Sequence, residues 1–157
     1  MNTVSVPFPF AHLVVSMNDD TVLSCHWSTN PVKNCNTPLA HIVIQQCQHY
    51  LSDGQYHFDL PLPTPRTAFE AAYRKLLDAL PAGKVLIYSE AATRLNSHPR
   101  AVGQTSRRNP VLLFVPCHRI IGMKNLGGYA GSTGDDALQE KRWLLQHEGV
   151  TQDVLFA

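Results

Sequence analysis

The chain has 157 residues, of which 44% are hydrophobic and 16% charged, and its formal net charge is +1. This composition is ordinary for a soluble globular protein and argues against a disordered chain. No apolar run approaches the ~20 residues that a membrane-spanning helix needs. The first residues lack the basic region and cleavage site of a signal peptide, so we expect a cytoplasmic protein, nuclear if the source is eukaryotic, with no membrane partner.

The four cysteines form no CxxC pair, and without an export signal we expect free thiols rather than disulfides. Cys25, His26, Cys35 and His41 are available as metal ligands, but their spacing matches no standard zinc motif. We therefore expect no metal and no other cofactor.

The first part of the chain predicts a small domain of strands and one helix. Residues 11–27 predict two strands around a turn at residues 18–20, and residues 39–51 have apolar side chains at helical spacing. Residues 51–60 predict a turn and a short strand. The prolines of residues 61–65 cannot continue either element, so we place a domain boundary there, between domains of residues 1–65 and 66–157.

The second part predicts helices. Thr67 and Glu70 form a capping-box pattern at the start of a helix that Pro81–Gly83 would end. Ser89 is a candidate N-cap for a short helix over residues 90–95, and Ser97 for a helix that ends near residue 107. Two short helices joined by a tight turn are typical of a helix-turn-helix.

The remaining elements follow a buried, strand-like run at residues 112–115. Residues 120–129 predict a hairpin with Gly127–Gly128 at its bend, and Asp135 is a candidate cap for a last helix that Gly149 ends. The predicted fold class is α/β (α+β). A small N-terminal strand–helix domain precedes a helical C-terminal domain with a winged helix-turn-helix.

Basic residues are concentrated between positions 84 and 124. Only one acid, Glu90, lies among seven basic side chains there: Lys84, Arg94, Arg100, Arg107, Arg108, Arg119 and Lys124. A basic block in a nearly neutral chain indicates a local site for a polyanion such as nucleic acid, although a solvated basic surface would look the same.

Cys117 is followed directly by His118 and Arg119, at the end of the apolar run. A thiol attacks only as a thiolate, so a nucleophilic cysteine needs a base, and that base needs a third group to orient it. Glu148 is the candidate third group. It lies in the last turn of a predicted helix, where a negative charge is unfavourable by ~0.3–1 kcal/mol, so a partner elsewhere would explain it. A solvated surface glutamate is the alternative.

The stretch RNPVLLFVPCHRIIG, with GKVLIYSEAATRL and RAVGQTSRRNP before it and GGYAG and KRWLLQHEG after it, resembles a known family. This family is the O6-alkylguanine-DNA alkyltransferases, also called methylated-DNA–protein-cysteine methyltransferases. The resemblance covers residues 66–149 well and is weaker over the first 60. It implies a DNA repair protein that moves the alkyl group of O6-methylguanine irreversibly to its own Cys117, in a single turnover.

The resemblance also implies roles for particular residues. Cys117 would accept the alkyl group, His118 would act as base through a water, Glu148 would orient His118, and Asn109 would be a hinge. Implied contacts to DNA or to the flipped-out base come from Tyr88, Arg100 (as a finger that enters the base stack), Ala101, Gly103, Arg107, Tyr129, Lys141 and a hydroxyl of Ser132 or Thr133. The implied partner is double-stranded DNA carrying an alkylated guanine, bound by a monomer.

Two other classes fit parts of the pattern. A damage-recognition protein would bind DNA without transfer, but it has no need of the thiol. A cysteine hydrolase acting on a small molecule would use Cys117 and His118, but it has no need of a basic helix-turn-helix or of Asn109 eight residues before the cysteine.

Overall fold

The computed structural model describes residues 2–155, which fall into two compact units. The first unit contains the chain up to residue 64 together with residues 110–114, and the second contains the rest. Residues 110–114, which the predicted boundary at residues 61–65 would place in the second domain, belong to the first unit. The reason is hydrogen bonding to Cys25, whose backbone N–H donates to the Pro110 carbonyl (2.9 Å) and whose Sγ donates to the Leu112 carbonyl (3.0 Å).

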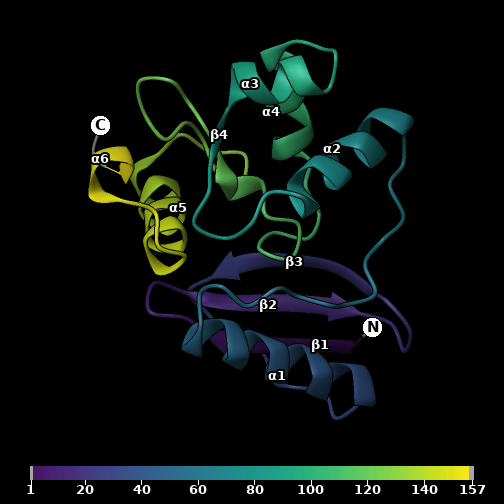
Figure 1. Cartoon of the computed structure of the whole chain (residues 1–157). Coiled ribbons are helices and arrows are strands. Elements are labelled where there is room, and N and C mark those ends of the chain that lie inside the picture. The colour runs from purple at the N-terminus through teal and green to yellow at the C-terminus, as the bar shows by residue number, and fades with distance from the viewer. Residues whose placement is uncertain (1, 156–157) are drawn as a thin grey trace. The chain divides into compact units, whose positions relative to one another are not determined.

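The first unit is an antiparallel sheet with one helix on a face (Figure 1). The strands β1 (Asn2–Pro7), β2 (His12–Met17) and β3 (Val22–Ser28) lie in the order β1-β2-β3. Helix α1 (Pro38–Ser52) begins at Thr37, whose hydroxyl accepts a hydrogen bond from the N–H of Ala40. The two predicted strands and the helix are confirmed, and β1 is an additional strand.

The short strand predicted within residues 51–60 does not form among these described residues. Instead of a neighbouring strand, the side chain of Gln46 on α1 bonds to the backbone of Asp59. Gln46 accepts from the N–H of Asp59 (2.9 Å) and donates to its carbonyl (2.8 Å), so the backbone there is satisfied without a neighbouring strand.

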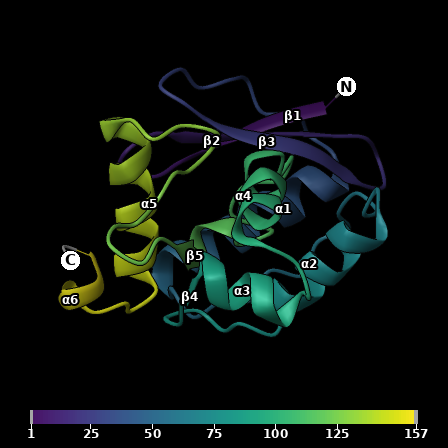
Figure 2. The same cartoon turned by 90° about the horizontal axis from the view of Figure 1, so that it is seen from above.

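The second unit is mostly helical (Figure 2). Its elements are α2 (Ala68–Asp78), β4 (Leu86–Ile87), α3 (Tyr88–Arg94), α4 (Pro99–Arg107), the 3-10 turn η1 (Cys117–Arg119), β5 (Ile120–Ile121), α5 (Asp135–His147) and α6 (Gln152–Leu155). The strands β4 and β5 pair in parallel. None of the helices in residues 2–155 has both the length and the apolar character needed to cross a membrane.

The predicted helix caps are partly corrected. Thr67 caps α2 as expected, because its hydroxyl accepts from the N–H of Glu70 (3.0 Å). Ser89 does not cap α3, which already begins at Tyr88. The cap of α4 is His98 rather than Ser97, because the helix begins one residue later than expected, at Pro99, and Nδ1 of His98 accepts from the N–H of Ala101 (3.4 Å).

The run of residues 112–115 is not a regular strand. Leu113 has φ 75°, a left-handed conformation that is strained for a bulky residue, so the chain reverses there. The predicted hairpin is also wrong, because β5 pairs with β4 and the tight turn instead joins Tyr129 to Ser132. Asp135 lies inside α5, which follows Gly134, and Gly149 follows its end with φ 97°.

Candidate active site

A cavity of about 440 Å³ lies within the second unit and opens beside the only cysteine of that unit, Cys117. Its walls come from the start of α3, from one face of α4 and from the loop between β5 and α5. The lining residues are Tyr88, Arg100, Gly103, Gln104, Ser106, Arg107, Cys117 and the run 128–133. This volume lies within the range of sites that enclose a small organic molecule.

Glycines allow the loop to lie close to both helices. A Cβ placed on Gly127 would lie 3.0 Å from the ring of Tyr88, and Gly127 also has φ +75°. A Cβ on Gly131 would lie 3.6 Å from Cγ of Arg107 on α4. The loop therefore forms the wall that faces the two helices, and a side chain at Gly127 would push it away from Tyr88.

Cys117 is placed at the cavity by a compact turn after the strained Leu113. The N–H of Cys117 donates to the Val115 carbonyl (2.8 Å), and the side-chain amide of Asn109 donates to the same carbonyl (2.8 Å). All residues from 111 to 121 are buried, and Cys117 is 4% exposed. Asn109 thus ties the end of α4 to the turn that carries the thiol.

The thiol of Cys117 is held in its protonated form. Burial raises the pKa of Cys117, while a hydrogen bond from Asn109 and the positive charge of Lys141 act to lower it. The net direction is upward, so a thiolate does not form spontaneously at neutral pH. Reaction at Cys117 therefore requires a base that removes the proton.

His118 and Glu148 form a buried pair behind the cysteine. Nε2 of His118 lies 2.7 Å from Oε2 of Glu148, and neither side chain is exposed. The other carboxylate oxygen of Glu148 accepts from Nε of Arg119 (2.9 Å), whose Nη1 donates to the Leu80 carbonyl (2.8 Å). Nδ1 of His118 is buried and has no hydrogen-bond partner among residues 2–155. With Nε2–H directed at Glu148, Nδ1 is the nitrogen that can accept a proton.

The carboxylate of Glu148 stays ionised. Burial acts to raise its pKa, but the charges and hydrogen bonds of His118 and Arg119 outweigh burial and lower the pKa to about 2. An ionised partner fixes the tautomer and the orientation of His118, which is the arrangement expected for an oriented base.

Lys141 is a buried cation beside the same site. Its Nζ donates to the carbonyls of Ile120 (2.8 Å) and Gly128 (2.9 Å) and lies 5.8 Å from the centre of the Tyr88 ring. Burial lowers the pKa of Lys141 to about 8, and Cys117 acts in the opposite direction. Lys141 therefore ties the loop to β5 and places a positive charge near the thiol.

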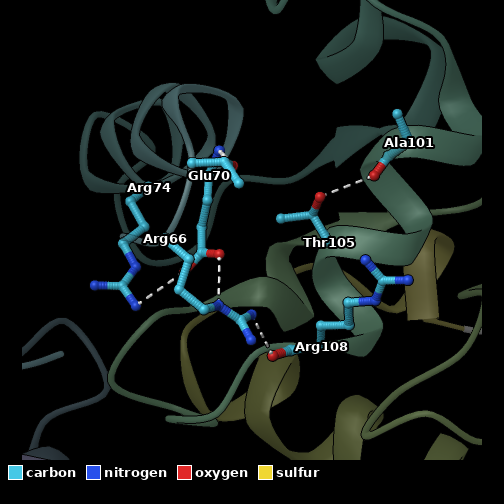
Figure 3. Close-up of polar contacts among 7 residues, drawn as sticks. Arg66, Glu70, Arg74, Ala101, Thr105 and Arg108 are labelled. Atoms are coloured by element: carbon cyan, nitrogen blue, oxygen red, sulfur yellow. Dashed lines mark hydrogen bonds and ion pairs between the residues drawn. The ribbon is translucent and has the colours of Figure 1, made fainter. Parts of the chain in front are cut away.

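Most of the predicted site residues meet at this cavity. Tyr88, Arg100, Gly103, Arg107, Cys117, Tyr129 and Ser132 line it. Several other predicted residues are not among the lining residues: His118, Glu148, Asn109 and Lys141. Ala101 is not among the lining residues, and its carbonyl accepts from Oγ1 of Thr105 (3.0 Å; Figure 3).

Ser132 and Thr133, the two candidates for the pocket hydroxyl, are both among the lining residues. The hydroxyl of Ser132 is also used locally, because it accepts from the N–H of Gly134 (3.0 Å). Gln104 and Ser106 are cavity residues that the sequence analysis missed. Gln104 could have been found, because residues 100, 103, 104 and 107 share one face of a helix.

The basic block is smaller than the sequence suggests. Arg119 is 8% exposed and paired with Glu148, so its charge is balanced inside the unit. The exposed basic side chains of the block are Lys84, Arg94, Arg100, Arg107, Arg108 and Lys124. These six still outnumber the single acid, Glu90, and so favour binding of a polyanion.

Metal ligands do not gather in the part of the chain that the structure describes. Within residues 2–155 no three side chains of His, Cys, Asp or Glu lie close enough to hold a metal ion. Of the candidates, Cys25 donates to the Leu112 carbonyl and His41 contacts the side chain of Asn36, so each has a partner in the protein.

Comparison with known proteins relates the chain to alkyl-transfer proteins. A family model described as the DNA-binding domain of 6-O-methylguanine DNA methyltransferase matches residues 68–150. The methylated-DNA–protein-cysteine methyltransferase of Archaeoglobus fulgidus is 37% identical over 107 residues, which cover 68% of this chain and 73% of the relative. The constitutive protein of the same name from Bacillus subtilis is 41% identical over 99 residues, which cover 61% of this chain and 60% of the relative.

Solved structures agree with the sequence matches. The crystal structure of the O6-methylguanine methyltransferase of Mycobacterium tuberculosis has a TM-score of 0.77 and 25% identity, over 94% of this chain and 92% of that chain. The M. tuberculosis OGT in complex with DNA matches with the same score and identity over both whole chains. The chain described here therefore belongs to the family of methylated-DNA–protein-cysteine methyltransferases, the 6-O-methylguanine DNA methyltransferases.

Proposed function

We propose that this chain repairs DNA by taking the alkyl group from O6 of a damaged guanine onto Sγ of Cys117. The observation that carries the proposal is the position of Cys117, which lines a 440 Å³ cavity while a buried His118–Glu148 pair lies behind it. Family membership supports the same chemistry.

The transfer begins with removal of the thiol proton. Because burial raises the pKa of Cys117, the proton leaves during the reaction, through a bridging water, to Nδ1 of His118. Glu148 holds the opposite nitrogen and stabilises the imidazolium that forms. Lys141 and the Asn109 amide favour the thiolate, since both lower the pKa of Cys117.

The thiolate then attacks the alkyl carbon. A bond forms between Sγ and this carbon, the bond from the carbon to O6 breaks, and its electron pair stays on the purine, which takes up a proton. The product at Cys117 is a thioether, which thiol exchange does not reverse. Each chain therefore acts once, and the protein is consumed by its own product.

The reactive carbon is buried in stacked duplex DNA, so the base must be flipped out at a cost of a few kcal/mol. We assign helices α3 and α4, joined by residues 95–98, as the helix-turn-helix; their short lengths and the short connection support this. On α4, Arg100 is exposed and lines the cavity, which suits a finger that fills the space left by the base. Arg107 and the other exposed basic residues would add affinity that is independent of sequence.

Small residues on α4 suit close approach to a groove. A Cβ placed on Gly103 would meet no atom of the protein within 4 Å, so packing within the protein does not require glycine there. Ala101 is the second small residue of this helix. We assign α4 to the minor groove, because repair has to ignore sequence and readout there is degenerate. Tyr88 and Tyr129, which both line the cavity, would contact the flipped nucleotide.

The protein would act as a monomer in the compartment that holds the DNA, which is the cytoplasm in a bacterium or archaeon. The family relatives described above come from such organisms.

The test is incubation with duplex DNA that contains O6-methylguanine, followed by intact-mass and peptide mass measurement. We expect one methyl group per chain, on Cys117, and an unmodified guanine in the DNA. Cys117→Ser should bind the same DNA without reacting. Repeated turnover with excess DNA, or a methyl group on Cys25, Cys35 or Cys47, would contradict the proposal.

A further inference from the structure

A pair of hydroxyl groups joins α2 to the wall of the cavity. The phenol oxygen of Tyr73 on α2 lies 2.6 Å from Oγ of Ser106 on α4. Tyr73 is 2% exposed, and Ser106 is one of the cavity-lining residues. The catalytic steps proposed above use neither residue.

The direction of this hydrogen bond follows from burial. Among the described residues, Ser106 is the only hydrogen-bond partner of the Tyr73 phenol. A buried phenolic proton without an acceptor is destabilising, whereas the Ser106 hydroxyl can turn its proton toward the cavity, so we infer that Tyr73 donates and Ser106 accepts. Burial, followed by the nearby Cys117, raises the pKa of Tyr73 well above its usual value, which keeps the phenol protonated as a donor.

The proton of the Ser106 hydroxyl then has no acceptor among residues 2–155. Its neighbour Thr105 behaves differently, because Oγ1 of Thr105 donates to the Ala101 carbonyl within the same helix (3.0 Å; Figure 3). Ser106 makes no such bond to its own helix and lines the cavity. The Ser106 hydroxyl is therefore available to donate a hydrogen bond to a molecule that enters the cavity.

The α4 backbone is also held at its end. Nη2 of Arg66 donates to the carbonyl of Arg108, the C-cap residue of α4 (3.5 Å), while Nε of the same guanidinium pairs with Glu70 on α2 (3.1 Å; Figure 3). Ser106 lies between this contact and the cavity residues Gly103 and Gln104. Tyr73 on α2 and Arg66, which lies just before α2, thus make two separate contacts that restrict the position of the Ser106 hydroxyl.

We propose that Ser106 is a specificity-determining residue that donates a hydrogen bond to an acceptor on the alkylated guanine, with Tyr73 as its positioning residue. This inference rests on the proposed function. The alkylated base offers acceptors at N1, N3, N7 and O6. A donor held in a fixed position in the cavity discriminates against a base that lacks the matching acceptor, because the donor is then left unpaired.

The test measures the rate of Cys117 methylation by duplex DNA containing O6-methylguanine. Ser106→Ala should slow the reaction about tenfold, the effect of one hydrogen bond of roughly 1.4 kcal/mol. Thr105→Ala is the matched control, because it removes the adjacent hydroxyl, which bonds only within α4. It should change the rate by less than about twofold. Ser106→Thr, which keeps the hydroxyl, should retain most of the rate.

Analogue bases separate a substrate contact from a structural role. The 1-deaza, 3-deaza and 7-deaza forms of O6-methylguanine each lack one ring acceptor, and the 6-thioether replaces O6 with a poor one. We expect wild type and Ser106→Ala to react equally with one of these four bases. If Ser106→Ala slows all four as much as the normal base, or if it slows none, the substrate contact is refuted.

Tyr73→Phe keeps the ring and tests the positioning role. It should slow the reaction severalfold in the wild-type background and have no further effect in Ser106→Ala, because Tyr73 acts through Ser106. A loss of equal size in both backgrounds would overturn this role. If Ser106→Ala fails to fold, the analogue bases are compared with Tyr73→Phe instead. If the wild-type chain leaves Cys117 unmodified, the proposed function itself is refuted. A defect that is confined to the variants does not refute the proposed function.

Discussion

Oε2 of Glu148 lies 2.7 Å from Nε2 of His118, and Oε1 of the same carboxylate lies 2.9 Å from Nε of Arg119. One buried carboxylate thus holds both residues that follow the cysteine. Arg119 balances part of the negative charge, so Glu148 can stay ionised in a buried position without taking the proton of His118. The orientation of His118 and the position of Arg119 in the turn after Cys117 therefore depend on the same side chain.

Glu148→Gln should slow alkyl transfer by roughly 10²-fold, because a neutral amide orients His118 less well and cannot stabilise the imidazolium. Binding of duplex DNA should change little, since Glu148 is only 1% exposed. Transfer is measured by single-turnover kinetics and binding by titration with Cys117→Ser in the background. Glu140→Gln, on the helix α5 that Glu148 follows directly, is the control. An unchanged transfer rate in a folded Glu148→Gln chain would make Glu148 a structural residue only.

The same carboxylate predicts a dependence of stability on pH. Because the pKa of Glu148 is lowered from 4.5 to about 2 in the fold, its contribution to the free energy of unfolding is complete above the unfolded pKa. This contribution, about 3 kcal/mol, is lost as the pH falls from about 4.5 to about 2. Denaturant unfolding of wild type and Glu148→Gln over this range should show the two curves converging at low pH. A gap that stays constant across the range would refute the assignment.

The buried position of Glu148 could be anticipated from the sequence, because a negative charge at the C-terminal end of a helix is unfavourable and indicates a partner elsewhere in the fold. The cavity wall on α4 could likewise be predicted from the sequence, since Arg100, Gly103 and Arg107 share one helical face. The course of the loop of residues 128–133 could not be predicted. Its course depends on Ala130 and Gly131 at φ 53° and 78° and on the bond from Lys141 to the Gly128 carbonyl, which no local pattern reveals.

The run of residues 112–115 shows a second limit. Its apolar residues predict a strand, yet Leu113 adopts a left-handed conformation and the backbone before it bonds to Cys25, which is more than 80 residues away. Arg119 was counted as a surface charge for the same reason, since only the fold brings it to Glu148. Hydrogen bonds between residues far apart in the sequence determine the course of residues 112–115 and the burial of Arg119, and hydrophobic periodicity does not reveal such bonds.

Lys141→Met should raise the pKa of Cys117 and slow alkylation by free O6-benzylguanine severalfold, because less of the thiol is then present as thiolate. The reason is loss of the buried positive charge that lowers the pKa of the thiol. The rate should be followed against pH, and the profile of the variant should lie at higher pH than that of wild type. Lys75→Met, an exposed lysine on α2, serves as control. Coincident profiles would remove Lys141 from any electrostatic role.

Gly103→Ala should stabilise the protein and weaken its binding to DNA. A Cβ at this position meets no protein atom within 4 Å, and alanine is favoured over glycine inside a helix by roughly 0.8–1.0 kcal/mol. The added methyl group would, however, hinder the close approach of α4 to a DNA groove. Thermal unfolding and titration with duplex DNA measure the two effects. A variant that is more stable and binds DNA as tightly as wild type would show that α4 does not approach the groove through Gly103.

Arg100→Ala should impair repair of duplex DNA far more than reaction with a free base. In duplex DNA the guanidinium would fill the space left by the flipped guanine, and loss of a contribution of a few kcal/mol corresponds to roughly 10²-fold in rate. Free O6-benzylguanine needs no flipping, so its reaction with Cys117 should slow by less than about threefold, although Arg100 lines the cavity. Both rates are measured on one preparation, so a folding defect would lower them together. Equal losses on the two substrates would show that Arg100 belongs to the cavity wall rather than to base extrusion. A loss on duplex DNA alone that disappears when the damaged guanine lies opposite a gap would identify the filling of the base stack as its role.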